Sequence, residues 1–164
     1  MKRVFLTICG TCLGPPGPGG WAFILRYGQY SIERSGGSSD TTKARMELQA
    51  ILEAFKAIME PCEVQCVSDN QWLLENVACR REERQLSCWS RLSAHLPDPL
   101  PDADLWKAID SLTERHLLGV LCGRQLSGSI DVKRCEELAV AQVGLHGEAP
   151  RMSGLIDRAA LATE

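Results

Sequence analysis

The first quarter of the chain alternates short apolar runs with clusters of glycine, proline and serine. The run Val4–Ile8 is apolar and rich in β-branched residues, which predicts a buried strand. Trp21–Tyr27 predicts a second strand, and the alternating segment Gln29–Ser35 predicts a third strand that pairs with it. Glycine and proline in Gly14–Gly20 predict a turn, and the small polar residues of Gly36–Asp40 predict a loop.

Beyond residue 40 the apolar positions follow a helical period. Thr41 or Thr42 can cap a helix that runs to about Met59, and Pro61 follows as a stop signal. The remaining predicted elements are, in order, a strand over Glu63–Ser68, a helix that begins at Asn70, a helix over Asp102–Arg115, a strand over Leu117–Cys122 and a helix from Asp131 to about Val143.

This order of elements predicts the fold class. Three successive strands, followed by helices that alternate with two more strands, predict an α/β fold with a five-stranded mixed sheet. Its first three strands are antiparallel, and helices cover both faces. At 164 residues we expect one main domain over residues 1–143. Residues 144–164 are predicted to form a C-terminal appendage, weakly ordered or with a short helix.

Composition and charge limit the possible partners. A net charge of −3 shows no sign of the basic face that usually grips a polyanion, so any nucleic-acid binding is predicted to be weak. No apolar run approaches membrane-spanning length, and the apolar stretch after Met1 is too short for a secretory signal. We therefore expect a cytoplasmic protein with no membrane partner.

The eight cysteines are expected to be free thiols in such a compartment. Cys9 and Cys12 form a C-x-x-C pair, which is typical of redox or zinc sites. However, Cys9 is placed at the end of a strand and Cys12 in the following turn, and no second C-x-x-C pair follows. Buried thiols that pack as small apolar side chains explain these residues better.

Four short motifs carry the candidate chemistry. Each alone has an ordinary explanation, because an acid in the first turns of a helix favours the dipole and an aspartate after a strand can cap a helix. In chain order the motifs are Thr7-Ile8-Cys9-Gly10, Arg45-Met46-Glu47-Leu48, Ser68-Asp69-Asn70-Gln71 and Arg134-Cys135-Glu136-Glu137-Leu138-Ala139. Their joint order resembles the bacterial type 1 ribonuclease H family, whose members cut the RNA strand of RNA/DNA hybrids. The resemblance extends from about Val4 to Val143 and implies a ribonuclease H-like fold.

The resemblance also implies a metal site with one altered position. Family members use two Mg²⁺ ions held by four carboxylates. Glu47 and Asp69 match two of these carboxylates, and Glu136 stands where the family more often has aspartate. Cys9 replaces the first catalytic aspartate, and a thiol is a poor ligand for magnesium. Glu47, Asp69 and Glu136 are therefore expected to hold Mg²⁺ or Mn²⁺ weakly, or no metal at all.

Other positions depart from the family pattern where the hybrid would be touched. Arg124 stands in place of the family's flexible histidine, and a permanently charged arginine cannot shuttle protons. Pro15, Lys43 and Ala44 replace family asparagines that contact the hybrid.

The remaining candidates for substrate contact are few. Thr42 and Gln71 match family positions, and the resemblance implies a substrate-binding role for both. Trp89 and Arg91 lie in the window of the family's basic protrusion and could stack on a duplex edge or bind a phosphate. That window mixes arginine with glutamate, which is also typical of a solvated charge cluster.

Three hypotheses follow. In the first, the chain is a pseudoenzyme that has lost most or all hydrolytic activity and binds nucleic acid. In the second, it is an active hybrid ribonuclease that prefers Mn²⁺ to Mg²⁺, because Mn²⁺ tolerates softer ligands. In the third, it is a protein-interaction module on the same scaffold, with a protein partner in place of nucleic acid.

Overall fold

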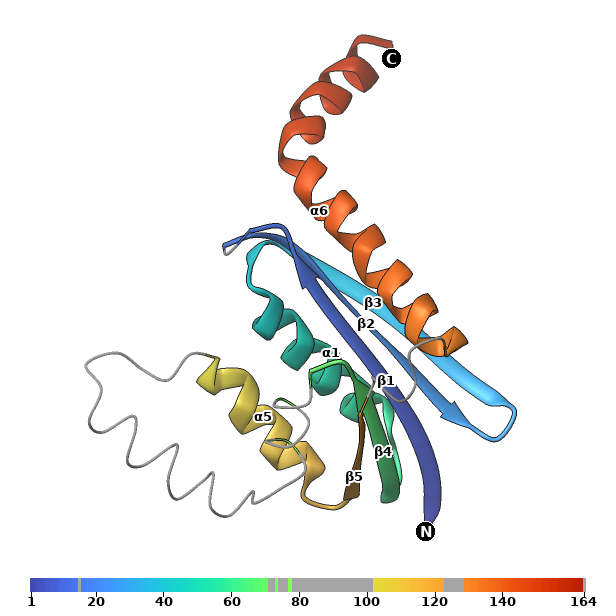
Figure 1. Cartoon of the computed structure of the whole chain (residues 1–164). Coiled ribbons are helices and arrows are strands. Elements are labelled where there is room, and N and C mark those ends of the chain that lie inside the picture. The colour runs from blue at the N-terminus through green and yellow to red at the C-terminus, as the bar shows by residue number, and fades with distance from the viewer. Residues whose placement is uncertain (15, 71–72, 74–76, 78–101, 123–128, 164) are drawn as a thin grey trace, which may run out of the picture.

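The computed structural model describes residues 1–14, 16–70, 73, 77, 102–122 and 129–163, and gives only the backbone for 120–122 and 147–163. A five-stranded sheet forms its centre (Figure 1). The strands are β1 (Lys2–Cys12), β2 (Gly17–Tyr27), β3 (Tyr30–Thr41), β4 (Cys62–Ser68) and β5 (Leu117–Cys122).

The sheet has the order β3-β2-β1-β4-β5. The first three strands pair antiparallel, whereas β4 pairs parallel with both β1 and β5. Parallel pairing requires a crossover, and helix α1 (Lys43–Ala57) lies in the connection that leads into β4. The predicted five-stranded mixed sheet is confirmed.

Helices cover both faces of the sheet, as predicted (Figure 1). Helix α1 and helix α5 (Ala103–Thr113) pack on one face, around a main core that includes Leu6, Phe23 and Phe55. Helix α6 (Ile130–Thr163) packs on the other face, over a smaller cluster of Ala22, Ile24, Cys135 and Ala139.

Alternation along β1 assigns its side chains to these two cores. Val4, Leu6 and Ile8 belong to the main core, whereas Cys9 packs against the cluster beneath α6. This is the period of two expected of a strand that is covered on both faces. Cys9 therefore faces α6.

The predicted start of the first helix is confirmed. Thr42 is the N-cap of α1, and its hydroxyl oxygen accepts a hydrogen bond from the Arg45 amide at 3.2 Å. This bond satisfies one of the amide groups that have no partner within the first turn of a helix.

The predicted loop at Gly36–Asp40 is wrong, because β3 continues through it to Thr41. The predicted turn is also shorter than expected, since β2 already begins at Gly17 and pairs there with Thr41. The small residues in these two strands leave room for α6, which lies close above them. A Cβ at Gly20 would collide with the carbonyl oxygen of Ala139.

The last helix is longer than its pattern predicts. The apolar period predicts an end near Val143, but α6 runs without interruption to Thr163. Gly144 has no positive φ angle and so does not form the left-handed cap that ends many helices. His146 lies against Gly37 of β3, and beyond it the helix curves away from the sheet (Figure 1). The division between a domain ending at residue 143 and an appendage stays a prediction.

No helix in the described part of the chain combines the length and apolar character needed to cross a membrane.

Candidate active site

The candidate site lies where β1 and β4 separate. Their parallel pairing ends at Thr7 and Val67, and Cys9 and Asp69 each follow two residues later. A small cavity of about 30 Å³ lies at this edge, which is enough room for one water molecule. It is lined by Thr7, Ile8, Cys9, Val67, Ser68, Asp69, Val132 and Glu136. Three of the predicted catalytic residues therefore meet at one cavity: Cys9 of β1, Asp69 directly after β4 and Glu136 of α6.

Cys9 carries no charge at neutral pH. Burial, together with the nearby negative charges of Asp69, Glu136 and Glu47, raises the pKa of its thiol to about 12. A protonated thiol is neither a nucleophile nor a good metal ligand. The position that resembles the first catalytic aspartate is therefore neutral.

Glu47 enters the site from the first turns of α1, and its side chain is only 2% exposed. Burial raises the pKa of its carboxyl group, although a hydrogen bond from Asn70 and the charge of Lys43 act in the opposite direction. The backbone of α1 comes very close to β1 here, since a Cβ on Gly10 would lie 2.5 Å from the Glu47 amide nitrogen. Only glycine fits at that position of the strand.

Asn70 holds the Glu47 carboxylate. Its side-chain amide donates a hydrogen bond of 2.7 Å to Glu47 Oε2. The other end of the same side chain accepts a hydrogen bond of 3.1 Å from the Leu73 amide. Sequence reasoning did not single out Asn70 as a site residue. The available signal was its position directly after Asp69, where β4 has ended and the sequence predicts the start of a helix.

Lys43 stands out in the sequence only as a departure from the family pattern, and it too belongs to the site. Its Nζ lies 3.8 Å from Glu47 Oε1, one helical turn away along α1. Both oxygens of Glu47 therefore have a partner from this chain.

Glu136 is positioned by the residue before it. Cys135 is fully buried, and its thiol donates to the carbonyl oxygens of Ala22 at 3.3 Å and Thr7 at 3.6 Å. These contacts join the first turns of α6 to β1 and β2. Glu136 follows directly and lines the cavity beside Cys9.

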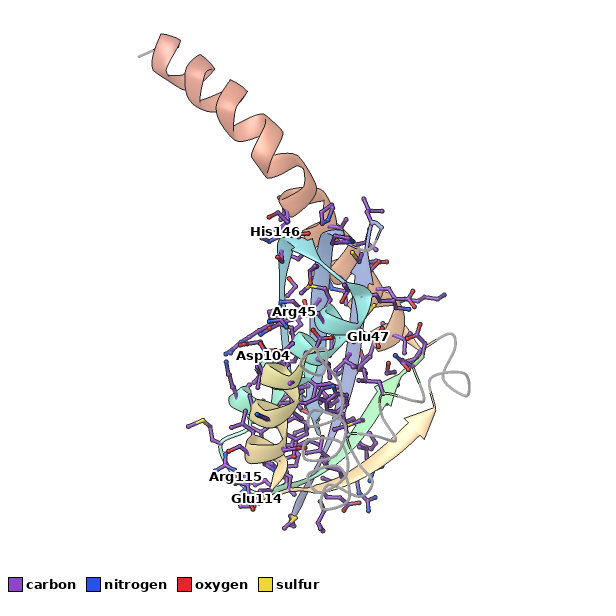
Figure 2. The ribbon with its side chains drawn as sticks, turned by 90° about the vertical axis from the view of Figure 1, so that its left-hand side faces the viewer. Arg45, Glu47, Asp104, Glu114, Arg115 and His146 are labelled. Carbon is purple, nitrogen blue, oxygen red and sulfur yellow. The ribbon has the colours of Figure 1, made fainter. Side chains whose placement is uncertain are left out.

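Arg45 fixes the start of α1 against α5. Its guanidinium binds Asp102 at 3.1 Å and Asp104 at 2.9 Å, and Figure 2 shows Arg45 beside Asp104. Arg45 thus supports the helix that carries Glu47 and does not face the cavity.

The remaining predicted contacts are only partly described. The Thr42 hydroxyl oxygen accepts the Arg45 amide hydrogen bond of the helix cap, and its role in substrate binding stays a prediction. Gln71, Trp89, Arg91 and Arg124 lie outside the described residues.

The donor set does not fit a pair of magnesium ions. Magnesium requires hard oxygen ligands in nearly octahedral geometry, and the Cys9 position offers a protonated thiol. Among the residues that the structure describes, no group of three or more histidine, cysteine, aspartate or glutamate side chains is arranged to hold a metal ion.

Comparison with known proteins defines the family. The chain matches the RNase H family over residues 2–142. It is 38% identical over 141 residues to a Ribonuclease H of Chelativorans sp. (strain BNC1), covering 86% of this chain and 85% of that protein. It is 39% identical over 140 residues to a Ribonuclease H of Nitratidesulfovibrio vulgaris (strain DP4), covering 84% of this chain and 87% of that protein. The chain belongs to the RNase H family.

Solved structures share the fold. LC9-RNase H1, a type 1 RNase H with the type 2 active-site motif, has a TM-score of 0.71 at 19% identity, over 88% of this chain and 74% of that chain. LC11-RNase H1 in complex with RNA/DNA hybrid has a TM-score of 0.56 at 15% identity, over 86% of this chain and 96% of that chain.

Proposed function

We propose that this chain binds RNA/DNA hybrid and has lost most or all of the hydrolytic activity of its family. The observation that carries the proposal is the neutral Cys9 thiol among Glu47, Asp69 and Glu136, which we call the acidic cluster. Without a carboxylate there, the site lacks one of the four carboxylates that would hold two metal ions in the family. One ion on Glu47, Asp69 and Glu136 stays a prediction, and such an ion would position an attacking water poorly.

The family and the fold support a nucleic-acid partner. LC11-RNase H1, solved in complex with RNA/DNA hybrid, shares the overall fold of this chain. The net charge of −3 implies weak and strongly salt-dependent binding. A cytoplasmic location is part of the same proposal, supported by the five free cysteines among the described residues.

Hybrid cleavage by the purified chain tests the loss of activity. With Mg²⁺ we expect a rate at least ~10³-fold below that of an active Ribonuclease H relative, the size of effect seen when one electrostatic group is lost from an active site. Cleavage at the relative's rate would overturn the proposal.

Two variants locate the cause of the loss. Cys9→Asp restores a carboxylate, and strong cleavage by this variant would show that the rest of the site is competent. Cys9→Ser is the matched control, because it replaces the thiol with a neutral group of similar size. If only the aspartate variant cuts the hybrid, the missing charge is the cause.

The other two hypotheses predict different results in the same assays. Strong cleavage by the parent chain with Mn²⁺ alone would identify an enzyme with altered metal preference. No measurable binding to hybrid, duplex DNA or single strands at low salt would identify a protein-interaction module.

A further inference from the structure

The buried Glu47 carboxylate needs a positive partner, because a charge removed from water is costly unless it is paired and hydrogen-bonded. Glu47 is 2% exposed, and Asn70 supplies a neutral hydrogen bond to one of its oxygens. The other oxygen lies 3.8 Å from the Lys43 ammonium. Among the described residues, Lys43 is therefore the cation that pairs with Glu47.

The position of Lys43 in α1 supports a role at the site. Lys43 is the first residue of the helix, where a positive charge opposes the helix dipole. The first turn of α1 contains no acidic residue that would offset this effect. A lysine is thus unfavourable for the helix at this position, and its compensating interaction is with the acidic cluster.

The charge of Lys43 also reaches Cys9. The lysine opposes the rise in the pKa of the Cys9 thiol, so the ammonium acts on the centre of the cluster as well as on Glu47. Because Cys9 is itself neutral, the cluster has less negative charge to balance than four carboxylates would have.

We infer that Lys43 is a resident counter-ion of the acidic cluster, which takes the place of a divalent cation beside Glu47. The site is then held together without a bound metal, and a metal ion must displace the ammonium to reach Glu47. This role of Lys43 rests on the proposed function and deepens it. Metal-binding measurements test the role of Lys43, whereas hybrid cleavage and hybrid binding test the proposed function.

The test is calorimetric titration of the full chain with Mn²⁺ and Mg²⁺ at constant ionic strength. We expect Lys43→Met to bind Mn²⁺ at least about fivefold more tightly than the parent, which corresponds to removal of one half-exposed ion pair. Lys43→Arg keeps the positive charge and should bind the ion as weakly as the parent.

Lys56→Met is the matched control. Lys56 lies on the same helix, thirteen residues after Lys43, and pairs with Glu53 at 3.1 Å. Equal Mn²⁺ affinity in the parent and Lys43→Met, no detectable binding by either, or an equal gain in Lys56→Met would each overturn the inference.

Thermal unfolding supplies a second readout. In EDTA, Lys43→Met should melt below the parent, because Glu47 then loses its positive partner among the described residues. Added Mg²⁺ should restore the lost stability in Lys43→Met and leave the parent unchanged, while NaCl of equal ionic strength should not. A Mg²⁺ response in the parent as large as in the variant would contradict the inference.

Discussion

At the scale of single residues, neighbours decide what each acidic or thiol group can do. Cys9 and Cys12 differ by three positions on one strand, yet their surroundings are unlike. Burial and three carboxylates raise the pKa of the Cys9 thiol to about 12. The Cys12 thiol instead donates to the carbonyl oxygens of Gly14 and Thr41, at 2.7 Å and 3.2 Å. A shared C-x-x-C motif therefore does not make the two residues a functional pair.

Asn70 is predicted to stabilise the protein through Glu47. Asn70→Ala leaves a nearly buried carboxylate oxygen and the Leu73 amide without their partner, which should lower the free energy of unfolding by about 1–3 kcal/mol. Urea denaturation at neutral pH measures this effect.

Gln49→Ala is the control for Asn70→Ala. It removes a similar amide–carboxylate bond of 3.0 Å, from Gln49 to Glu53 on α1. Because the Glu53 side chain is 28% exposed whereas Glu47 is only 2% exposed, we expect a loss below about 0.5 kcal/mol. Equal losses in the two variants would show that Asn70 has no special role.

His116 is predicted to make stability depend on pH. Its Nδ1 accepts a hydrogen bond of 3.1 Å from the Cys62 amide, which requires that nitrogen to be unprotonated. Burial, aided by the charge of Arg115, lowers the pKa of His116 below 6.5. As the pH falls, His116 is therefore protonated at a higher pH in the unfolded chain than in the folded chain. The contribution of His116 to stability is complete above about pH 6.5 and is lost as the pH falls below that value.

His116→Asn tests this prediction, because an asparagine oxygen can accept the same bond but does not titrate. Urea midpoints at about pH 7.5 and about pH 5.5 should differ more for the parent than for the variant. An identical pH dependence would exclude His116 as the cause.

The sequence allowed the candidate acids to be found but not the hydrogen bond that Asn70 donates to Glu47. Cys9, Glu47 and Asp69 stand in local motifs with a recognisable order. The Asn70–Glu47 bond joins residues 23 positions apart, and it depends on how the end of β4 meets the start of α1. Such a contact leaves no local pattern in the chain.

At the scale of elements, the packing of α6 on β2 and β3 depends on residues without side chains. Gly20 lies under Ala139, and Gly37 lies under His146. Ion pairs at the edge of this interface join Arg26 to Asp131 at 2.7 Å and Arg134 to Glu33 at 3.1 Å. The glycine-rich end of β3 has the local pattern of a loop. It is nevertheless a strand that packs against a helix about a hundred residues later in the chain, and a local pattern does not include such a contact.

Gly20→Ala is predicted to destabilise the protein by about 1–3 kcal/mol, because the added methyl group must push α6 away from the sheet. Gly144→Ala is the matched control on α6 itself. Among the described atoms, none lies within 4 Å of a Cβ at Gly144, so the helix should gain up to about 1 kcal/mol. Thermal or urea unfolding measures both, and a stabilised Gly20→Ala variant would contradict the close packing.

At the scale of the whole molecule, the contacts of α6 predict how much of the chain the fold needs. A chain that ends after His146 retains every described side-chain contact of α6 with the sheet, and it should melt within a few degrees of the full chain. A chain that ends after Ser129 exposes the apolar cluster of Ala22 and Ile24 and should lose cooperative unfolding. Circular dichroism during heating measures the unfolding of both shortened chains. A large loss of stability in the chain that ends after His146 would place the domain boundary beyond that residue.

The attachment of α6 also determines when the acidic cluster can exist during synthesis. The bonds from Cys135 to Thr7 and Ala22 join residues 128 and 113 positions apart. At a translation rate of about 5–20 residues per second, β1 waits several seconds on the ribosome before these bonds can form. Glu47 and Asp69 are therefore present in the nascent chain well before Glu136 is made. The cluster of like charges is completed only when the last helix docks, after the rest of the sheet can already support it.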